Sequence, residues 1–389
     1  MFELTSEDAL CLNVMMAGEL QAVRIDASSM TVFGLSPRGT ASVRLHPNCR
    51  PDQYLRTVRE VLAGHALDSP GGYPVHLQRW TRMGQAREKG LDRLLLLGEP
   101  EAVTSVAYSN GLTDELARRA WWAMPVPDHA RRMLERECVV NGGMGKVLAD
   151  FLVDYLPFET DPHIIVDTIK ILLQPGLIDQ KTRDQLWNKG GADNAYLVGF
   201  LARTPDDLPD QRAARHDYAA IREKLAPLID GDNRYAQSLL RLLSGPGQTF
   251  LHAYEEVLRY PANQDVFKEL LEALWSYFFE YHPESSRERE DTIEAALGQV
   301  SLEMSETAPV GAIHELINVL PELHAEIGAL LILSKVNSSI AKPILSQTTA
   351  HGTLMRKKLE PVSLPLLQQI TVLQGKEFSA TTSRRRAHY

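Results

Sequence analysis

Cysteine is scarce in this sequence, because the 389 residues include only Cys11, Cys49 and Cys138. Their number is odd, they lie far apart and no CxxC pair occurs, which excludes a disulfide framework and a cysteine-rich zinc site. We therefore expect three reduced thiols in a cytoplasmic setting, on small side chains that are buried or half-buried. A redox or metal role is the alternative, but it needs partner residues that the local sequence does not supply.

A surplus of positive charge is also lacking, since 41 Lys and Arg against 50 Asp and Glu give a net charge of −9. Contacts to phosphates need clustered Lys and Arg, so a general nucleic-acid binder is excluded and only a local basic patch stays open. Long hydrophobic runs are missing too: residues 327–336 are far shorter than the roughly 20 residues that span a bilayer. Glu3, Glu7 and Asp8 stand where a signal peptide carries positive charge. We expect a cytoplasmic protein without membrane insertion.

The sequence lacks the common catalytic motifs HExxH, GxSxG and GxGxxG. Residues 141–147 (NGGMGKV) resemble a phosphate-binding loop, but valine occupies the place of its first glycine and valine follows the lysine. Residues 230–235 (DGDNRY) lack two required positions of a calcium loop and are interpreted as a helix cap. His314 and His324 are ten residues apart, too far for a helical pair of metal ligands. The sequence therefore predicts no catalytic residue, no cofactor and no metal site.

The N-terminal region carries the signals of a helix followed by a small sheet. A helix should begin after Thr5 or Ser6 and stop at Gly18, because a hydroxyl cap, an acidic first turn and a glycine mark its ends. The next residues alternate and are rich in β-branched side chains, which predicts an antiparallel meander. Its strands are expected at residues 21–26, 30–36 and 40–46. Another helix should begin at Pro51.

An internal repeat indicates how the following helices are organised. Residues 109–122 and 174–187 align without a gap, with Gly, Leu, Asp, Arg and Trp at matching positions. Gly143 lies 32 residues after Gly111 and 33 before Gly176. This spacing predicts a helix–turn–helix unit of about 32 to 34 residues with a C-cap glycine at each inner turn. Tetratricopeptide repeats have this length, but their signature is absent, so a HEAT-like array with short units is the better match. A chance similarity is the alternative.

The predicted fold is mainly α: a helical-hairpin repeat array (a HEAT-like solenoid) with a small N-terminal antiparallel β-meander. A polar, proline-containing stretch predicts a linker between two helical regions. The final segment lacks an apolar period and should be disordered. The predicted divisions are an α+β cap at 1–90, hairpin repeats at 91–204, the linker at 205–217, an acidic helical region at 218–373 and a disordered tail at 374–389.

Residues 71–85 (GGYPVHLQRWTRMGQ) are the most distinctive run in the chain. Read as a helix, this run places Trp80 on an apolar face, while Arg79 and Arg82 point elsewhere. One interpretation is a buried aromatic anchor beside solvated arginines, and we favour it for Trp80. The other is an exposed cluster that binds a partner protein or an anion, because Trp and Arg dominate binding hot spots. Arg79, Trp80 and Arg82 are therefore the candidate partner-binding residues.

Several segments, including the run around Trp80, together carry a family likeness. The chain resembles the DsrS family, which is encoded beside the reverse dissimilatory sulfite reductase of sulfur-oxidising bacteria. The likeness is strong from residue 4 to about residue 200 and vaguer beyond. It implies a soluble cytoplasmic accessory or regulatory protein of sulfur oxidation, and it carries over neither catalytic residues nor a cofactor. The segments are LTSEDALCLNV (4–14), QAVRIDASSMTV (21–32), the run at 71–85, LLLLGEPEAV (94–103) and GLTDELARRAWWAMP (111–125).

Together these observations predict a non-enzymatic accessory or regulatory protein that acts through contacts with a protein partner. Helical arrays present long surfaces and seldom supply a pre-formed catalytic pocket. Two alternatives stay open. RNA binding would use the basic residues at 356–358 (Arg356, Lys357, Lys358) and at 384–386 (Arg384, Arg385, Arg386). A thiol-based sulfur carrier or enzyme would use a cysteine such as Cys138.

Overall fold

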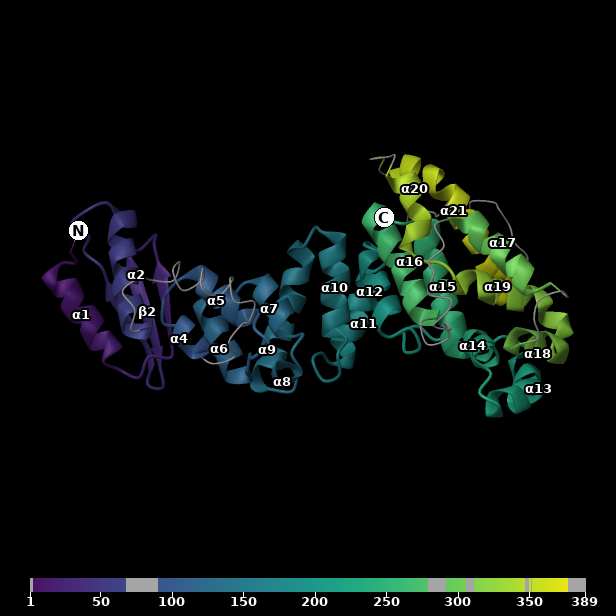
Figure 1. Ribbon diagram of the computed structural model, residues 1–389, viewed down its shortest axis with the longest axis horizontal. Coiled ribbons are helices and arrows are strands. Elements are labelled where there is room, and N and C mark those ends of the chain that lie inside the picture. The colour runs from purple at the N-terminus through teal and green to yellow at the C-terminus, as the bar shows by residue number, and fades with distance from the viewer. Residues whose placement is uncertain are drawn as a thin grey trace. The chain divides into compact units, whose positions relative to one another are not determined.

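The computed structural model describes residues 3–67, 90–278, 292–305, 311–346, 350 and 352–376 of the chain (Figure 1). In this part the fold is mainly helical and contains one small three-stranded antiparallel sheet, which confirms the predicted class. Contacts divide the chain into two compact units. Unit 1 comprises Met1–Phe158 and Gln174–Ile178, and unit 2 comprises Glu159–Leu173 and Asp179–Tyr389. The predicted divisions of the chain remain sequence-based.

Unit 1 begins with a helix, the sheet and a second helix, and continues with short helices. Its elements are α1 (Ser6–Met16), β1 (Ala22–Asp26), β2 (Thr31–Ser36), β3 (Gly39–Arg44), α2 (Pro51–Leu67), α4 (Leu91–Leu94), α5 (Pro100–Ala107), α6 (Asp114–Ala123), α7 (Pro127–Met133), α8 (Glu137–Val140), α9 (Gly143–Tyr155) and the 3-10 turn η1 (Leu156–Phe158).

The local signals placed the first elements correctly. Thr5 caps α1, since its hydroxyl accepts the backbone N–H of Asp8, and the helix ends two residues before Gly18. The sheet has the order β1-β2-β3 with both pairs antiparallel, as predicted from the alternation. Helix α2 begins at Pro51, as predicted.

The two faces of β1 and β2 pack against different elements, while β3 is mostly exposed. Val23 and Val32 face a core that also contains Leu12 of α1 and Leu55 and Val58 of α2. Because successive strand residues point to opposite faces, Arg24 and Phe33 lie on the other side. There the guanidinium of Arg24 lies 4.9 Å from the ring centre of Phe33 and 5.2 Å from that of Trp122 in α6. This stack joins the sheet to the helices that follow it.

The aligned aspartates of the internal repeat have different roles. Asp114 accepts the backbone N–H groups of Gly143 and Met144, each at 3.0 Å, and so caps α9 from a neighbouring helix. Asp179 instead accepts the N–H of Thr182 and caps its own helix, α11 (Gln180–Lys189). The prediction of a C-cap glycine at Gly143 was wrong, because Gly143 is the first residue of α9. A Cβ on the preceding Gly142 would lie 2.3 Å from the Asp114 side chain, so this approach requires glycine.

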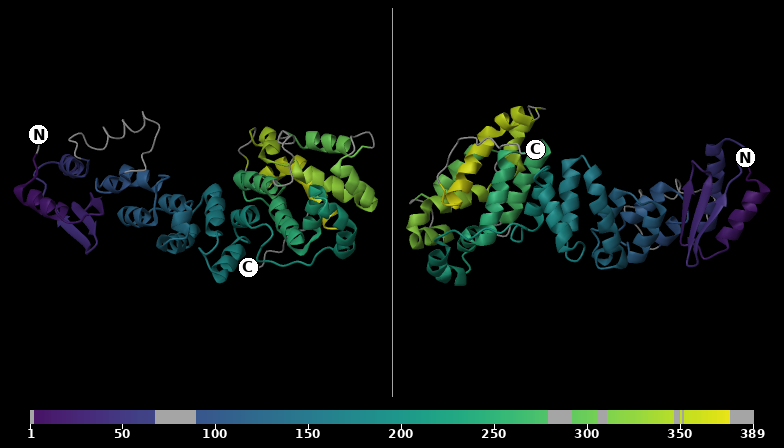
Figure 2. Two further views of the ribbon diagram at one scale, coloured as in Figure 1. Left: turned by 60° about the horizontal axis from the view of Figure 1, so that its bottom comes forward. Right: turned by 180° about the vertical axis from the view of Figure 1, so that it is seen from behind.

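The regular elements in the described part of unit 2 are all helices (Figure 2). Helix α12 (Ala195–Arg203) packs against α10 (Pro162–Leu172), α15 (Gly245–Arg259) and α16 (Gln264–Phe278). Helix α21 (Gly352–Leu373) packs against α15 and α19 (His324–Ser334). Asn233 caps α14, as predicted for residues 230–235. Besides α11, the elements are α10 (Pro162–Leu172), α12 (Ala195–Arg203), α13 (Tyr218–Asp230), α14 (Arg234–Leu243), α15 (Gly245–Arg259), α16 (Gln264–Phe278), α17 (Ile293–Glu303), α18 (Ala312–Val319), η4 (Pro321–Leu323), α19 (His324–Ser334), η5 (Ser338–Ala341), α20 (Lys342–Leu345) and α21 (Gly352–Leu373).

Within the described residues, no single helix has both the length and the apolar character that a bilayer span requires. Only α18 taken together with residues 321–334 meets that test, and this pair is bent by 109° at its break.

Candidate functional site

The predicted partner-binding residues Arg79, Trp80 and Arg82 lie outside the described residues. Their assignment therefore stays a prediction. The described residues contain two other features with the character of binding sites. One is a polar pocket in unit 2, and the other is a row of aromatic side chains in unit 1.

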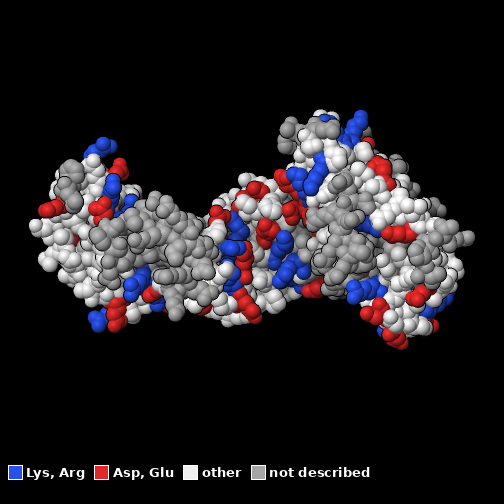
Figure 3. All heavy atoms as spheres, in the orientation of Figure 1, with Lys and Arg blue, Asp and Glu red and all other residues white. Residues whose placement is uncertain are grey.

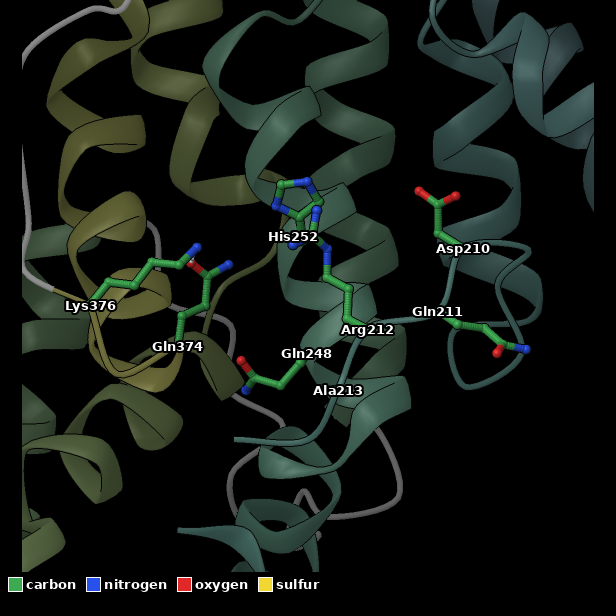
Figure 4. Close-up of a pocket in the computed structure, with 8 residues that line it drawn as sticks. All are labelled: Asp210, Gln211, Arg212, Ala213, Gln248, His252, Gln374 and Lys376. Atoms are coloured by element: carbon green, nitrogen blue, oxygen red, sulfur yellow. Dashed lines mark hydrogen bonds between the residues drawn. The ribbon is translucent and has the colours of Figure 1, made fainter. Parts of the chain in front are cut away.

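The polar pocket lies where three segments of unit 2 meet, and it has a volume of about 510 Å³. The segments are the extended chain at 210–213, helix α15 and the residues that follow α21. Figure 4 shows the Arg212 side chain reaching towards His252, with Gln374 and Lys376 entering from the end of α21. The lining residues are Asp210, Gln211, Arg212, Ala213, Gln248, His252, Gln374 and Lys376.

The position of Arg212 is fixed by the start of α15. Its backbone N–H donates to the hydroxyl of Thr249 at 3.1 Å, and that hydroxyl donates to the carbonyl of Gly245 at 2.9 Å. A Cβ on Gly245 would lie 2.8 Å from the Arg212 carbonyl oxygen, so glycine allows the two backbones to approach. A smaller hollow of about 240 Å³ lies beside the same segment and is also lined by Arg212 and Thr249.

A helix terminus places the second cation of the pocket. Gly375 has a φ of 66°, and its N–H bonds the carbonyl of Val372, while the N–H of Lys376 bonds the carbonyl of Thr371. This is the Schellman arrangement that ends many helices at a left-handed glycine. It directs Lys376 back to the pocket, where Nζ donates to Oε1 of Gln374 at 2.6 Å (Figure 4).

Gln248 and His252 lie one turn apart on α15 and form the inner wall of the pocket. The buried amide of Gln248 donates from Nε2 to the carbonyls of Leu242 and Leu373, at 2.9 and 3.3 Å. Burial lowers the pKa of His252, and the charges of Arg212 and Lys376 lower it further, against the opposite effect of nearby glutamates. Both cations are therefore close enough to act on the imidazole.

Four aromatic side chains form the row on unit 1. The ring of Trp121 in α6 meets Phe151 of α9 edge-on at 4.8 Å, and Phe151 stacks with Tyr155 at 6.0 Å. Phe158 follows at 6.5 Å and is 75% exposed, while the other three are half-buried. Residues 151, 155 and 158 share one helical face, because side chains three and four positions apart are neighbours. We name Trp121, Phe151, Tyr155 and Phe158 the aromatic row.

The cysteines are more accessible than predicted. Cys11 and Cys138 are exposed, so their predicted burial was wrong, whereas Cys49 is half-buried as expected. Cys138 lies on the exposed side of the short helix α8, and Val139 is the fully buried residue of that helix. Its thiol donates to the carbonyl of Leu112 at 3.2 Å. In the described part of the chain, no three His, Cys, Asp or Glu side chains are grouped to hold a metal ion.

Charges of opposite sign are interspersed on the face of the molecule in Figure 3, where blue and red side chains lie beside one another. Ion pairs are common among the described residues, for example those of Arg118 and Arg119 with Glu115 and of Lys170 with Asp167. Among the described residues on this face, no broad region carries positive charge alone.

Comparison of the chain with protein-family models, with curated proteins and with solved structures finds no match.

Proposed function

We propose that the protein is a non-enzymatic accessory or regulatory component of bacterial sulfur oxidation that works in the cytoplasm through contacts with a protein partner. The pathway rests on the resemblance to the DsrS family. The arrangement of the hairpins as a HEAT-like solenoid, which would offer a long contact surface, belongs to the same proposal.

The aromatic row is the observation that supports partner binding most directly. Aromatic side chains are enriched at protein interfaces and rare as exposed groups, since each leaves apolar area in water. Phe158 is 75% exposed and continues a series of neighbouring rings, in a tilted contact with Tyr155. A cluster of aromatic side chains of this kind is typical of a hot spot in which a few residues supply most of the binding energy.

The experiment is affinity capture with the full chain from sulfur-oxidising cells grown on reduced sulfur. Phe158→Ser should abolish capture of a defined partner while leaving the melting temperature unchanged, because the side chain is mostly in solvent. Leu302→Ser is the matched control, since Leu302 is 72% exposed in unit 2 and lies outside the row. Equal capture by the wild type and by Phe158→Ser would contradict the role of the row.

The thiol alternative keeps one supporting observation, the exposure of Cys138. Replacement of all three cysteines by serine separates the two functions. A partner-binding protein should keep its capture, whereas a sulfur carrier should lose its function in a protein that still folds. A gel-shift titration over a range of salt concentrations tests RNA binding through the basic residues, because phosphate contacts give a steep salt dependence.

A further inference from the structure

The polar pocket contains positive charge that its surroundings neutralise only in part. Among the described residues, the guanidinium of Arg212 makes no ion pair, and Nζ of Lys376 bonds only the neutral amide of Gln374. Three acids nearby are engaged elsewhere: Asp206 pairs with Arg241, and Asp217 and Glu326 pair with Arg215. Glu255 pairs with Arg259, but the charge of Lys376 also helps to lower its pKa, so Glu255 offsets part of the lysine's charge. Only Asp210 remains on the rim as a lining carboxylate without an ion pair in the described part of the chain.

His252 gives a second measure of this excess charge. Burial is the largest cause of its lowered pKa, and Arg212 from the extended segment and Lys376 from the end of α21 act in the same direction. Glu255 and Glu256 of its own helix act against them and do not cancel the shift. Nδ1 of this imidazole is buried and has no hydrogen-bond partner among the described residues. A bound anion would offset the two cations and favour the protonated ring.

We infer that this pocket binds a phosphate-type dianion, either the free ion or the terminal group of a small phosphate ester. Arg212 and Lys376 supply two full charges, and His252 supplies a third when an anion raises its pKa. Guanidinium and ammonium groups are the usual donors to phosphate oxygens. The volume of about 510 Å³ lies in the range of small-molecule sites and exceeds what one free ion fills. The side-chain oxygens of Asp210 and Gln211 would accept hydrogen bonds from the hydroxyl groups of such an ester.

This inference is independent of the proposed protein partner, and it is tested with the full chain by calorimetry at low salt and pH 8. The probes are inorganic phosphate, glycerol 3-phosphate and acetate. Arg212→Gln and Lys376→Gln should each weaken phosphate binding by about tenfold or more, as expected for loss of a charged hydrogen bond. Arg222→Gln, at an exposed arginine on α13 outside the pocket, is the control and should bind as the wild type does.

The binding measurements give results that support the inference and results that overturn it. Tighter binding of glycerol 3-phosphate than of phosphate would identify an ester as the ligand, and equal binding would identify the free ion; both support the inference. No binding at millimolar phosphate, equally tight binding of acetate, or an equal loss in Arg222→Gln would overturn it. Nuclear magnetic resonance of the histidine ring protons gives an independent measurement. Phosphate should raise the pKa of one resonance, the one that disappears in His252→Gln, and a pKa that does not move would also overturn the inference.

Discussion

The hydroxyl group of Tyr54 donates a 2.5 Å hydrogen bond to Oδ2 of Asp8, whose side chain is only 1% exposed. The contact ties α2 to α1 beneath the sheet, 46 residues apart in sequence. The same carboxylate accepts the backbone N–H of His46 at 2.8 Å, and the hydroxyl of Tyr54 accepts the N–H of Thr5 at 3.1 Å. A buried charge is tolerated here because several donors surround it.

Tyr54→Phe should lower the free energy of unfolding by about 1–3 kcal/mol, the usual cost of a buried charged group that loses a partner. Burial alone would raise the pKa of Asp8, but the bonds from Tyr54 and His46 outweigh it and hold that pKa below 3.8. A carboxyl with a lowered pKa stabilises the fold above its unfolded pKa and loses that effect as the pH falls. The difference between wild type and variant should therefore be largest at neutral pH and shrink below about pH 4. Urea unfolding at several pH values checks this, and a difference that grows in acid would refute it.

Asp114→Ala should destabilise unit 1 by about 0.5–2 kcal/mol, the range for loss of a helix cap. The reason is that both N–H groups at the start of α9 bond to this carboxylate rather than to a residue of their own segment. Asp154→Ala, at an exposed position on the same helix, is the control and should change little. Thermal unfolding measures both, and equal melting temperatures for the two variants would show that Asp114 is dispensable.

Gly375→Ala should cost about 1–2 kcal/mol, because a left-handed φ strains any residue with a Cβ. The new Cβ would lie 3.4 Å from the Arg215 side chain, an ordinary van der Waals distance, so the cost comes from the backbone conformation. Gly298→Ala provides the contrast, since its Cβ would meet nothing within 4 Å in α17 and helical alanine is favoured by roughly 0.5–1 kcal/mol. Opposite shifts of the melting temperature are expected, and a stabilising Gly375→Ala would argue against the Schellman end of α21.

The sequence predicted features whose signals are local and missed those that depend on distant contacts. The cap at Thr5 and the three strands could be read because capping and alternation act within a few residues. The polar pocket could not, since it brings together Arg212, His252 and Lys376 from three separate segments. One local signal was available: an apolar helix followed by glycine and lysine marks a helix end, which was assigned to the tail instead.

The burial predicted from amino-acid type was wrong for two cysteines, because the packing of the helices decides which side chains are exposed. Cysteine is among the residues most often buried, yet Cys138 lies on the outer side of a single-turn helix that has room for one inward side chain. The matched aspartates at 114 and 179 show the same limit. Their sequences align, but the first caps a neighbouring helix and the second its own. Which helix lies beside which is set by packing that no short pattern contains.

The guanidinium of Arg215 offers the last prediction, because its side chain is 4% exposed and holds two carboxylates. It donates two bonds to Asp217, at 2.6 and 2.7 Å, and one to Glu326 of α19 at 2.9 Å. Arg215→Met should cost about 1–3 kcal/mol, since it leaves two half-buried acids without their charged partner. Removing the charge of Asp217 as well should cost less than leaving it without a partner. The double variant Arg215→Met/Asp217→Asn should therefore be more stable than the sum of the two single effects predicts. Urea unfolding of the wild type, the two single variants and the double variant gives the coupling energy. Additive effects would show that the pair does not act as a unit.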